Sequence, residues 1–148
     1  MKQLMILLIF LLSISSCKKS IEINSVVSPN KIIGTWKLVY GEIKEGDSVQ
    51  IKDLSRTKFI KIINEDHFAF FNQIENEEEG YYSGGGTYSL KGKDYTEKLD
   101  YISLTTLRGE EFHFTIEFKG DTLIQSGLED VEEANIKRYI VEKYIKVD

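Results

Sequence analysis

The stretch of sequence that decides the fold is Ile32-Ile33-Gly34-Thr35-Trp36-Lys37-Leu38-Val39-Tyr40, which begins soon after the only proline and holds the only tryptophan. Apart from Gly34, its even-numbered positions from Ile32 to Tyr40 are apolar, whereas its odd-numbered positions are mixed. Alternation of this kind is typical of a strand that lies with one face on a hydrophobic core. We therefore predict that this stretch is the first strand of a closed or nearly closed β-sheet.

The composition indicates a single domain and disfavours one class of partner. A chain of 148 residues, of which 41% are hydrophobic, can build one core. Eight Tyr, eight Phe and many β-branched residues favour strands over helices. The formal net charge is −5, and acidic and basic residues are interspersed. Binding to a phosphate backbone needs a basic face, so we expect no nucleic-acid partner.

The N-terminal segment is predicted to be a signal rather than part of the fold. Lys2 supplies a positive start, an apolar run follows over residues 4–12, and Ile14-Ser15-Ser16 precede the only cysteine, Cys17. This arrangement resembles a bacterial lipoprotein signal peptide, residues 1–16, after which Cys17 is acylated. The apolar run is shorter than the roughly 20 residues that span a bilayer. The alternatives are an uncleaved membrane anchor and an ordinary signal peptide with a chance cysteine.

Residues 17–30 comprise the acylated cysteine and a polar segment rich in small residues, which we predict to be a flexible tether. A lipid on Cys17 makes the membrane a partner and places the protein in the cell envelope. Lys18 follows the cysteine. By resemblance to Gram-negative sorting signals, a lysine there favours the outer membrane.

The rest of the chain predicts one strand after another, joined by short connections. Residues 58–63 and 67–74 are predicted to form a hairpin around the turn Asn64-Glu65-Asp66. Gly84-Gly85-Gly86 interrupts the next strand, residues 81–90. Because no Lys-Ser/Thr pair follows these glycines, they indicate a bent or bulged strand rather than a phosphate-binding loop. Residues 112–118 show the most regular alternation in the chain.

The C-terminal part completes an all-β meander. Residues 128–135 are acidic and are predicted to form one or two helical turns before a final strand over residues 137–147. One face of that strand carries Tyr139, Val141, Ile145 and Val147. We expect eight strands in consecutive order, without the long crossovers that parallel sheets need. Such a sheet closes into a small up-and-down barrel, which is either filled by side chains or holds one small ligand.

The domain expected over residues 31–148 resembles the lipocalin superfamily. Gly34-Thr35-Trp36 matches the Gly-x-Trp motif of that family, and Arg138 lies on the last predicted strand, where the family places an arginine across the tryptophan ring. Residues 86–90 and 94–97 are similar to the lipocalin-like lipoproteins of Bacteroidetes-type bacteria. The resemblance implies a lipocalin-like barrel in which Trp36 and Arg138 plug the closed end in a structural role.

Candidates for ligand contact are aromatic residues of the middle strands that we expect to point into the barrel. They are Phe68, Phe70, Tyr95, Tyr101, Phe112 and Phe114. The alternative is that these side chains simply fill the interior. Glu97 shares a face with Tyr95 by alternation, and a carboxylate inside an apolar barrel must be paired, hydrogen-bonded or protonated. In the opposite orientation of this strand, Glu97 would be solvated.

The sequence does not favour catalysis. His67 and His113 alternate with phenylalanines, which puts them on outer faces, and neither has a second ligand at a spacing typical of a metal site. The chain has no Gly-x-Ser-x-Gly motif, and its only cysteine is assigned to the lipid. We therefore expect no enzyme activity, no metal and no cofactor.

Two functional hypotheses from different classes follow. In the first, a monomeric, lipid-anchored barrel shelters a small apolar or amphipathic molecule in the cell envelope. In the second, the interior is filled, and the protein acts by binding another protein through its outer face. A cavity lined by Phe and Tyr favours the first hypothesis, and an exposed apolar patch on a filled barrel favours the second.

Overall fold

The structure is a computed structural model, and it describes residues 28–77 and 79–147. The predictions about the signal peptide, the acylation of Cys17 and the tether up to residue 27 lie outside the described residues. The predicted domain from residue 31 onward lies almost entirely within them.

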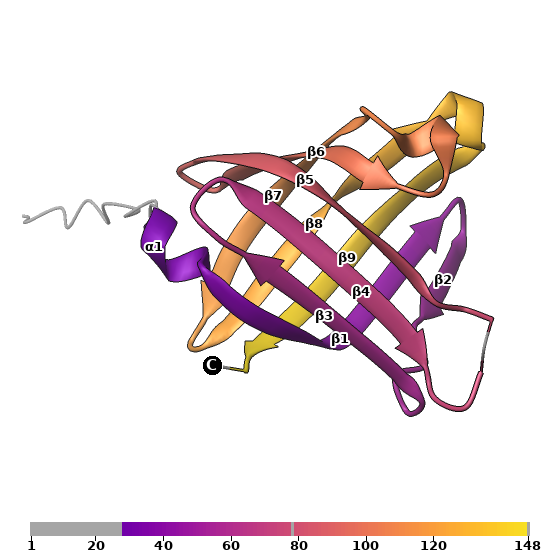
Figure 1. Cartoon of the computed structure of the whole chain (residues 1–148), viewed down its shortest axis with the longest axis horizontal. Coiled ribbons are helices and arrows are strands. Elements are labelled where there is room, and N and C mark those ends of the chain that lie inside the picture. The colour runs from indigo at the N-terminus through magenta and orange to yellow at the C-terminus, as the bar shows by residue number, and fades with distance from the viewer. Residues whose placement is uncertain (1–27, 78, 148) are drawn as a thin grey trace, which may run out of the picture.

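Eight antiparallel strands form a closed barrel, as the sequence predicts (Figure 1). Each strand pairs with the next, and the last strand returns to pair with the first. The barrel strands are β1 (Gly34–Glu45), β3 (Thr57–Ile63), β4 (His67–Ile74), β5 (Tyr82–Lys91), β6 (Asp94–Ile102), β7 (Glu111–Lys119), β8 (Thr122–Val131) and β9 (Ile136–Lys146). The short strand β2 (Ser48–Ile51) pairs with the far end of β1 and lies outside the barrel. Because every barrel strand has two hydrogen-bonded neighbours and the strands together enclose a hydrophobic core, the barrel has what a domain needs to fold alone.

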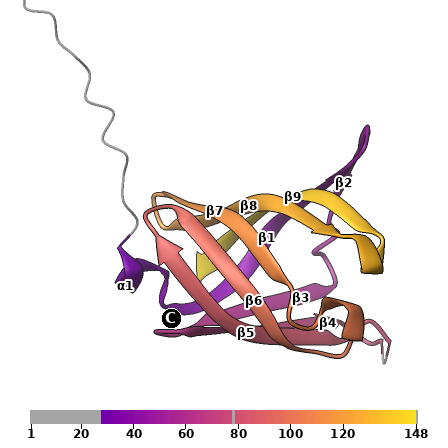
Figure 2. The same ribbon diagram turned by 90° about the horizontal axis from the view of Figure 1, so that it is seen from above.

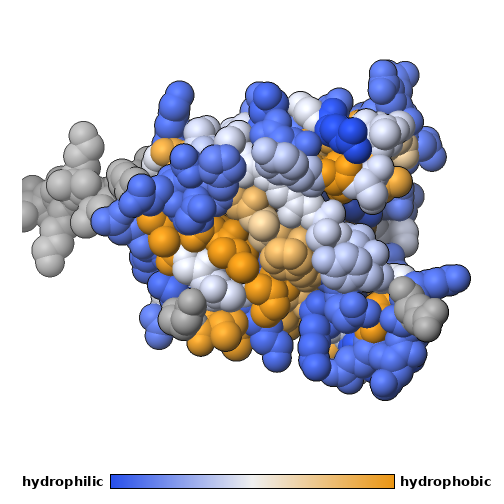
Figure 3. Space-filling view, viewed as in Figure 1, coloured by the Kyte–Doolittle hydropathy of each residue, from blue (hydrophilic) through white to orange (hydrophobic). Residues whose placement is uncertain are grey.

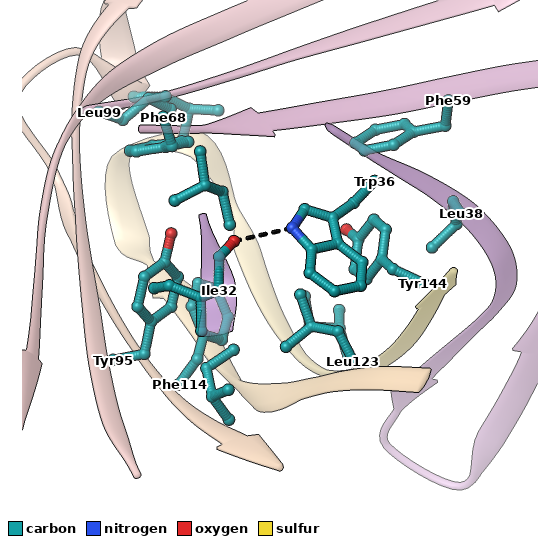
Figure 4. Close-up of a cluster of buried hydrophobic side chains, with 14 of the residues drawn as sticks. Ile32, Trp36, Leu38, Phe59, Phe68, Tyr95, Leu99, Phe114, Leu123 and Tyr144 are labelled. Carbon is teal, nitrogen blue, oxygen red and sulfur yellow. Dashed lines mark hydrogen bonds between the residues drawn. The ribbon is translucent and has the colours of Figure 1, made fainter. Parts of the chain in front are cut away.

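One end of the barrel is closed by a helical turn and the tryptophan. The turn α1 (Pro29–Ile32) replaces the predicted start of the first strand, since a proline at the first helical position favours a helix. Trp36 Nε1 donates a hydrogen bond to the carbonyl oxygen of Ile32 at 2.8 Å (Figure 4). Both side chains are buried, and the Trp36 and Phe118 rings lie 6.0 Å apart. This packing excludes water from the end of the barrel at which β1 begins.

Arg138 does not take part in this plug, contrary to the expectation from the lipocalin resemblance. Trp36 pairs in register with Lys146, whose Nζ lies 5.7 Å from the indole centroid. Arg138 lies roughly 26 Å away along β9, since it precedes Lys146 by eight positions and a strand rises about 3.3 Å per residue. There its Nε donates to Glu129 Oε2 at 2.6 Å, near the opposite end of the barrel.

The triple glycine allows β5 and β6 to approach each other at a bulge. The sequence predicts a bend or bulge in the glycine strand itself, whereas the extra residue lies in its partner, β6. The register of the pair shifts between Gly85 and Thr87, so that two residues of β6 oppose Gly86. A Cβ on Gly86 would lie only 1.9 Å from the carbonyl oxygen of Lys98. The bulge also breaks the predicted alternation of β6. Tyr101 therefore points outward and is 69% exposed instead of facing the interior.

Two short helical turns lie at the end of the barrel opposite α1 (Figures 1 and 2). They are η1 (Thr105–Leu107) between β6 and β7, and η2 (Glu132–Ala134) between β8 and β9. The helical turn predicted within residues 128–135 is present but shorter: β8 continues to Val131, and η2 forms one turn before β9. In β9, the face of Tyr139 and Ile145 is the outer one, whereas Glu142 and Tyr144 point inward. Among the described residues, no helix has the length and apolar character to cross a bilayer.

Candidate ligand cavity

A cavity of about 470 Å³ occupies the half of the barrel away from α1. Its size falls within the roughly 300–1,000 Å³ of small-molecule sites. Its walls are mostly aromatic and aliphatic, and they include Phe59, Phe70, Tyr82, Leu99, Ile102, Leu104, Leu107, Phe112, Phe114, Ile136 and Ile140. The other half of the barrel is filled by the buried side chains of the plug and its neighbours, which Figure 4 shows in part.

The alternation of the strands brings part of the predicted aromatic set to the cavity. Phe70, Phe112 and Phe114 line it, and the rings of Phe112 and Phe114 lie stacked with centroids 6.3 Å apart. Phe68 and Tyr95 point inward but pack into the filled part of the barrel, outside the cavity lining. These two residues help to fill the interior, which is the alternative that the sequence left open.

Glu97 faces inward, is buried, and forms an ion pair at the base of the cavity. Its carboxylate contacts the Nζ of Lys61, and the two side chains are 8% and 3% exposed. Lys61 Nζ also donates to Gln125 Oε1 at 2.8 Å. The inward orientation is one of the two that the sequence allowed for Glu97. The pairing with a buried lysine meets the requirement that a carboxylate in an apolar interior be neutralised.

A second ion pair lies next to this one and involves Glu142 of β9. Lys52 enters from the segment after β2, and its Nζ lies 3.0 Å from Glu142 Oε1. The other oxygen of Glu142 accepts a hydrogen bond from the Tyr144 hydroxyl at 2.5 Å. We call the five residues Lys61, Glu97, Gln125, Glu142 and Tyr144 the cavity floor. Arg138 and Glu129 form a third, more exposed pair at the cavity rim.

The two floor carboxylates differ in their electrostatic environment. Burial raises the pKa of Glu97, and the opposing effect of Lys61 does not offset it. Burial also acts to raise the pKa of Glu142, but Lys52, Lys61 and the Tyr144 hydrogen bond outweigh it, so that this pKa is lowered. Two lysines therefore act on Glu142, whereas one acts on Glu97. Burial raises the pKa of Tyr95 and of Tyr144 well above their usual range, and the neighbouring carboxylates add to this effect.

Sequence reasoning missed Lys52, Lys61, Glu142 and Tyr144. In β3, the residues that share the inner face are Phe59, Lys61 and Ile63, so period-two alternation does place Lys61 inside. A lysine on a strand is most often exposed, however, and only its partner on β6 makes burial favourable. The partner lies 36 positions away in the sequence, so the pairing cannot be inferred from either strand alone.

The cavity combines an apolar wall with a polar base. His67 and His113 lie on the outer surface, as the alternation predicts. Within residues 28–77 and 79–147, no group of three or more His, Cys, Asp or Glu side chains is arranged to hold a metal ion. What the cavity offers a ligand is an apolar wall along its length and hydrogen-bonding groups at its base.

A second concave surface lies on the outside of the barrel. The glycines of β5 leave an open groove of about 540 Å³, bordered by Phe71 of β4, Tyr81 and the displaced Tyr101 of β6. Figure 3 shows apolar surface on the face of the barrel that carries β3 and β4. Ile62 and Phe71 contribute to this face and are 42% and 41% exposed.

Comparison with known proteins identifies a family for this barrel. No curated protein matches the chain. A family model described as a domain of unknown function, DUF4488, matches residues 31–148, which include all strands of the barrel. The chain belongs to the DUF4488 family.

Proposed function

We propose that this protein is a lipid-anchored binding module of the cell envelope, which holds one small hydrophobic or amphipathic molecule inside a lipocalin-like barrel. The observation that carries the proposal is the cavity of about 470 Å³, with aromatic and aliphatic walls and a polar floor. Protein interiors are normally packed as densely as organic crystals. In a cavity of this size, the apolar wall side chains lack packing contacts that a ligand would supply.

The contrast between the two halves of the barrel supports a bound ligand. Around Trp36, large buried side chains pack against one another, so this chain can pack the barrel interior where that is needed. In the other half, Ile140 and Glu142 of β9 point inward. Together with Phe112 and Phe114 of β7, they line the cavity instead of filling it. A molecule with an apolar body and one polar end matches these walls and this floor.

The proposed anchor gives the barrel a direction relative to the membrane. The described chain begins at the end of the barrel closed by α1 (Figure 1). A lipid on Cys17 would hold this end near the bilayer, since residues 18–27 reach at most roughly 35 Å when extended. The cavity rim lies at the opposite end. We infer that the barrel exchanges its ligand with the aqueous compartment or with a soluble partner.

Mass spectrometry of the intact domain tests the binding proposal. Residues 28–148, produced in the periplasm of a Gram-negative host and kept under native conditions, should carry a small molecule that denaturation releases. Ile140→Trp should displace that molecule, because Ile140 lines the cavity. Leu128→Trp is the matched control, since Leu128 lies on the outer face of β8 and is 48% exposed. A ligand-free mass, together with no thermal shift across a panel of lipids, would defeat the proposal.

The outer groove supports a second candidate function, the binding of another protein through the face of β4 to β6. Phe71, Tyr81 and Tyr101 border this groove and are 41%, 54% and 69% exposed. Exposed aromatic residues around a concave surface are typical of interaction sites. Cross-linking in cells tests this candidate. Tyr101→Ser should abolish a cross-linked product that Ile140→Trp leaves intact.

A further inference from the structure

We propose that the cavity selects amphiphiles whose buried end is uncharged and hydrogen-bonding, such as a primary amide or an alcohol, over alkyl carboxylates and alkylammonium ions. This inference rests on the proposed binding function and adds the chemical class of the ligand's polar end. It follows from the charges that line the cavity and from the hydrogen bonds that the floor still has to offer.

The ionic groups of the cavity are balanced in number and in position. Three cations and three carboxylates line it, and each cation is matched with a carboxylate of its own. The pairs are Lys61 with Glu97, Lys52 with Glu142 and Arg138 with Glu129. Within the described residues, therefore, the cavity holds no cation that is left over for an anionic ligand.

A charged ligand end would lose its hydration without gaining a counter-ion. A carboxylate that approaches Lys61 also approaches Glu97, and one that approaches Lys52 also approaches Glu142. An ammonium group meets the reverse situation. Because desolvation of an ion is repaid only by good pairing, both kinds of charged end bind poorly at a floor whose charges are already paired.

An uncharged polar end, in contrast, finds donors and acceptors on the floor. Lys61 Nζ has three N–H groups, of which Glu97 and Gln125 take two. Since Gln125 Oε1 accepts from Lys61, the orientation of its amide is set, and Nε2 is the free end. No described residue accepts a hydrogen bond from Nε2, although the side chain is only 2% exposed and lines the cavity. An amide or hydroxyl oxygen can accept these hydrogen bonds, and its own proton can be donated to a floor carboxylate.

Displacement of N-phenylnaphthylamine, a neutral fluorescent probe, from residues 28–148 tests the selectivity. Decanol, decanamide, decanoate and decylammonium share one chain length and differ only in the polar end. Decanol and decanamide should displace the probe with dissociation constants at least about tenfold lower than those of the two ions. Decanoate binding as tightly as decanamide would overturn the selectivity and leave the binding function standing. Failure of the probe and of all four compounds to bind would overturn the binding function itself.

Removing one floor charge should change the preference in a predictable direction. Glu97→Gln leaves Lys61 without its carboxylate, so decanoate should then bind at least about tenfold more tightly than it does to the unchanged protein. Glu142→Gln frees Lys52 in the same way and serves if the first variant does not fold. Glu111→Gln on the outer face of β7 is the matched control and should leave all four constants unchanged.

The double variant Lys61→Gln with Glu97→Gln separates charge balance from a general loss of fit. It removes one cation and one carboxylate together, so the preference for decanol and decanamide should return. A decanoate affinity that stays unchanged in folded Glu97→Gln, or that stays high in the double variant, would contradict the inference.

Discussion

The Lys61 side chain shows how a single residue can be stable inside the barrel only through its partners. It is 3% exposed and contacts Glu97 and Gln125. Lys61→Met should lower the free energy of unfolding by about 3–5 kcal/mol, because it leaves a buried carboxylate without a counter-ion. Urea denaturation followed by circular dichroism measures this change. Lys58→Met, at an exposed position of the same strand, should cost less than about 1 kcal/mol.

The pH dependence of the unfolding free energy of Lys61→Met tests whether the unpaired Glu97 carboxylate causes this loss of stability. Without the lysine, the pKa of Glu97 should rise further from its already raised value. A carboxyl whose pKa is higher in the folded state than in the unfolded state stabilises the fold at low pH, and that stability is lost as the pH rises through the folded-state pKa. The variant should therefore recover stability on acidification. The double variant Lys61→Met with Glu97→Leu should lose this pH response, and its retention there would assign the response to another group.

Trp36 is the other residue on which the barrel depends. It is 2% exposed and closes one end through its hydrogen bond to Ile32. Trp36→Ala should destabilise the domain by roughly 3–5 kcal/mol, because the substitution opens a cavity in a packed region. Trp36→Phe keeps much of the volume and should cost clearly less. Since the chain has no other tryptophan, circular dichroism rather than fluorescence should follow unfolding. A change near zero for Trp36→Ala would mean that the plug is not needed.

At the scale of the element, the bulge between β5 and β6 decides which side chains enter the cavity. Gly86 lies where a Cβ would approach the Lys98 carbonyl to 1.9 Å. Gly86→Ala should therefore force the two strands apart and cost at least about 2 kcal/mol in unfolding free energy. Ser89→Ala, an exposed position of the same strand, should stay within about 0.5 kcal/mol of the unchanged protein. Thermal and urea denaturation of both variants make the comparison. Equal stabilities would show that the close approach is not required.

The same element marks where strand patterns in the sequence stop being reliable. Alternation along β6 correctly places Tyr95, Glu97 and Leu99 inside, but it fails one step later at Tyr101. The extra residue of the bulge shifts the pattern by one, which exchanges the inner and outer faces. Gly84-Gly85-Gly86 does predict a bulge in this region. It does not show which residue of the partner strand is the extra one, because that depends on the register between strands.

At the scale of the whole molecule, the described chain begins at the closed end of the barrel, and the proposed anchor, Cys17, precedes it in the sequence. Cys17→Ser should abolish incorporation of a labelled fatty acid into the protein, because the acceptor thiol is absent. Labelling of cells with an alkyne-bearing palmitate, followed by precipitation of the protein, measures this loss. Ser16→Ala keeps the cysteine and a small residue before it, so it should retain the label. Label that persists in Cys17→Ser would exclude acylation at this residue.

The sequence by itself determined the class of this protein: an all-β, consecutive eight-stranded barrel, with Trp36 buried at its start. These features depend on alternation and turn residues, which act over neighbouring positions along the chain. Only the tertiary structure decided that the barrel contains a cavity, that Lys61 and Glu142 are inside, and that Arg138 is at the rim rather than over the tryptophan. Each of these depends on the register between strands and on ion pairs between distant residues. A local pattern does not encode them, because a charged residue is buried only where the closed sheet brings it a partner.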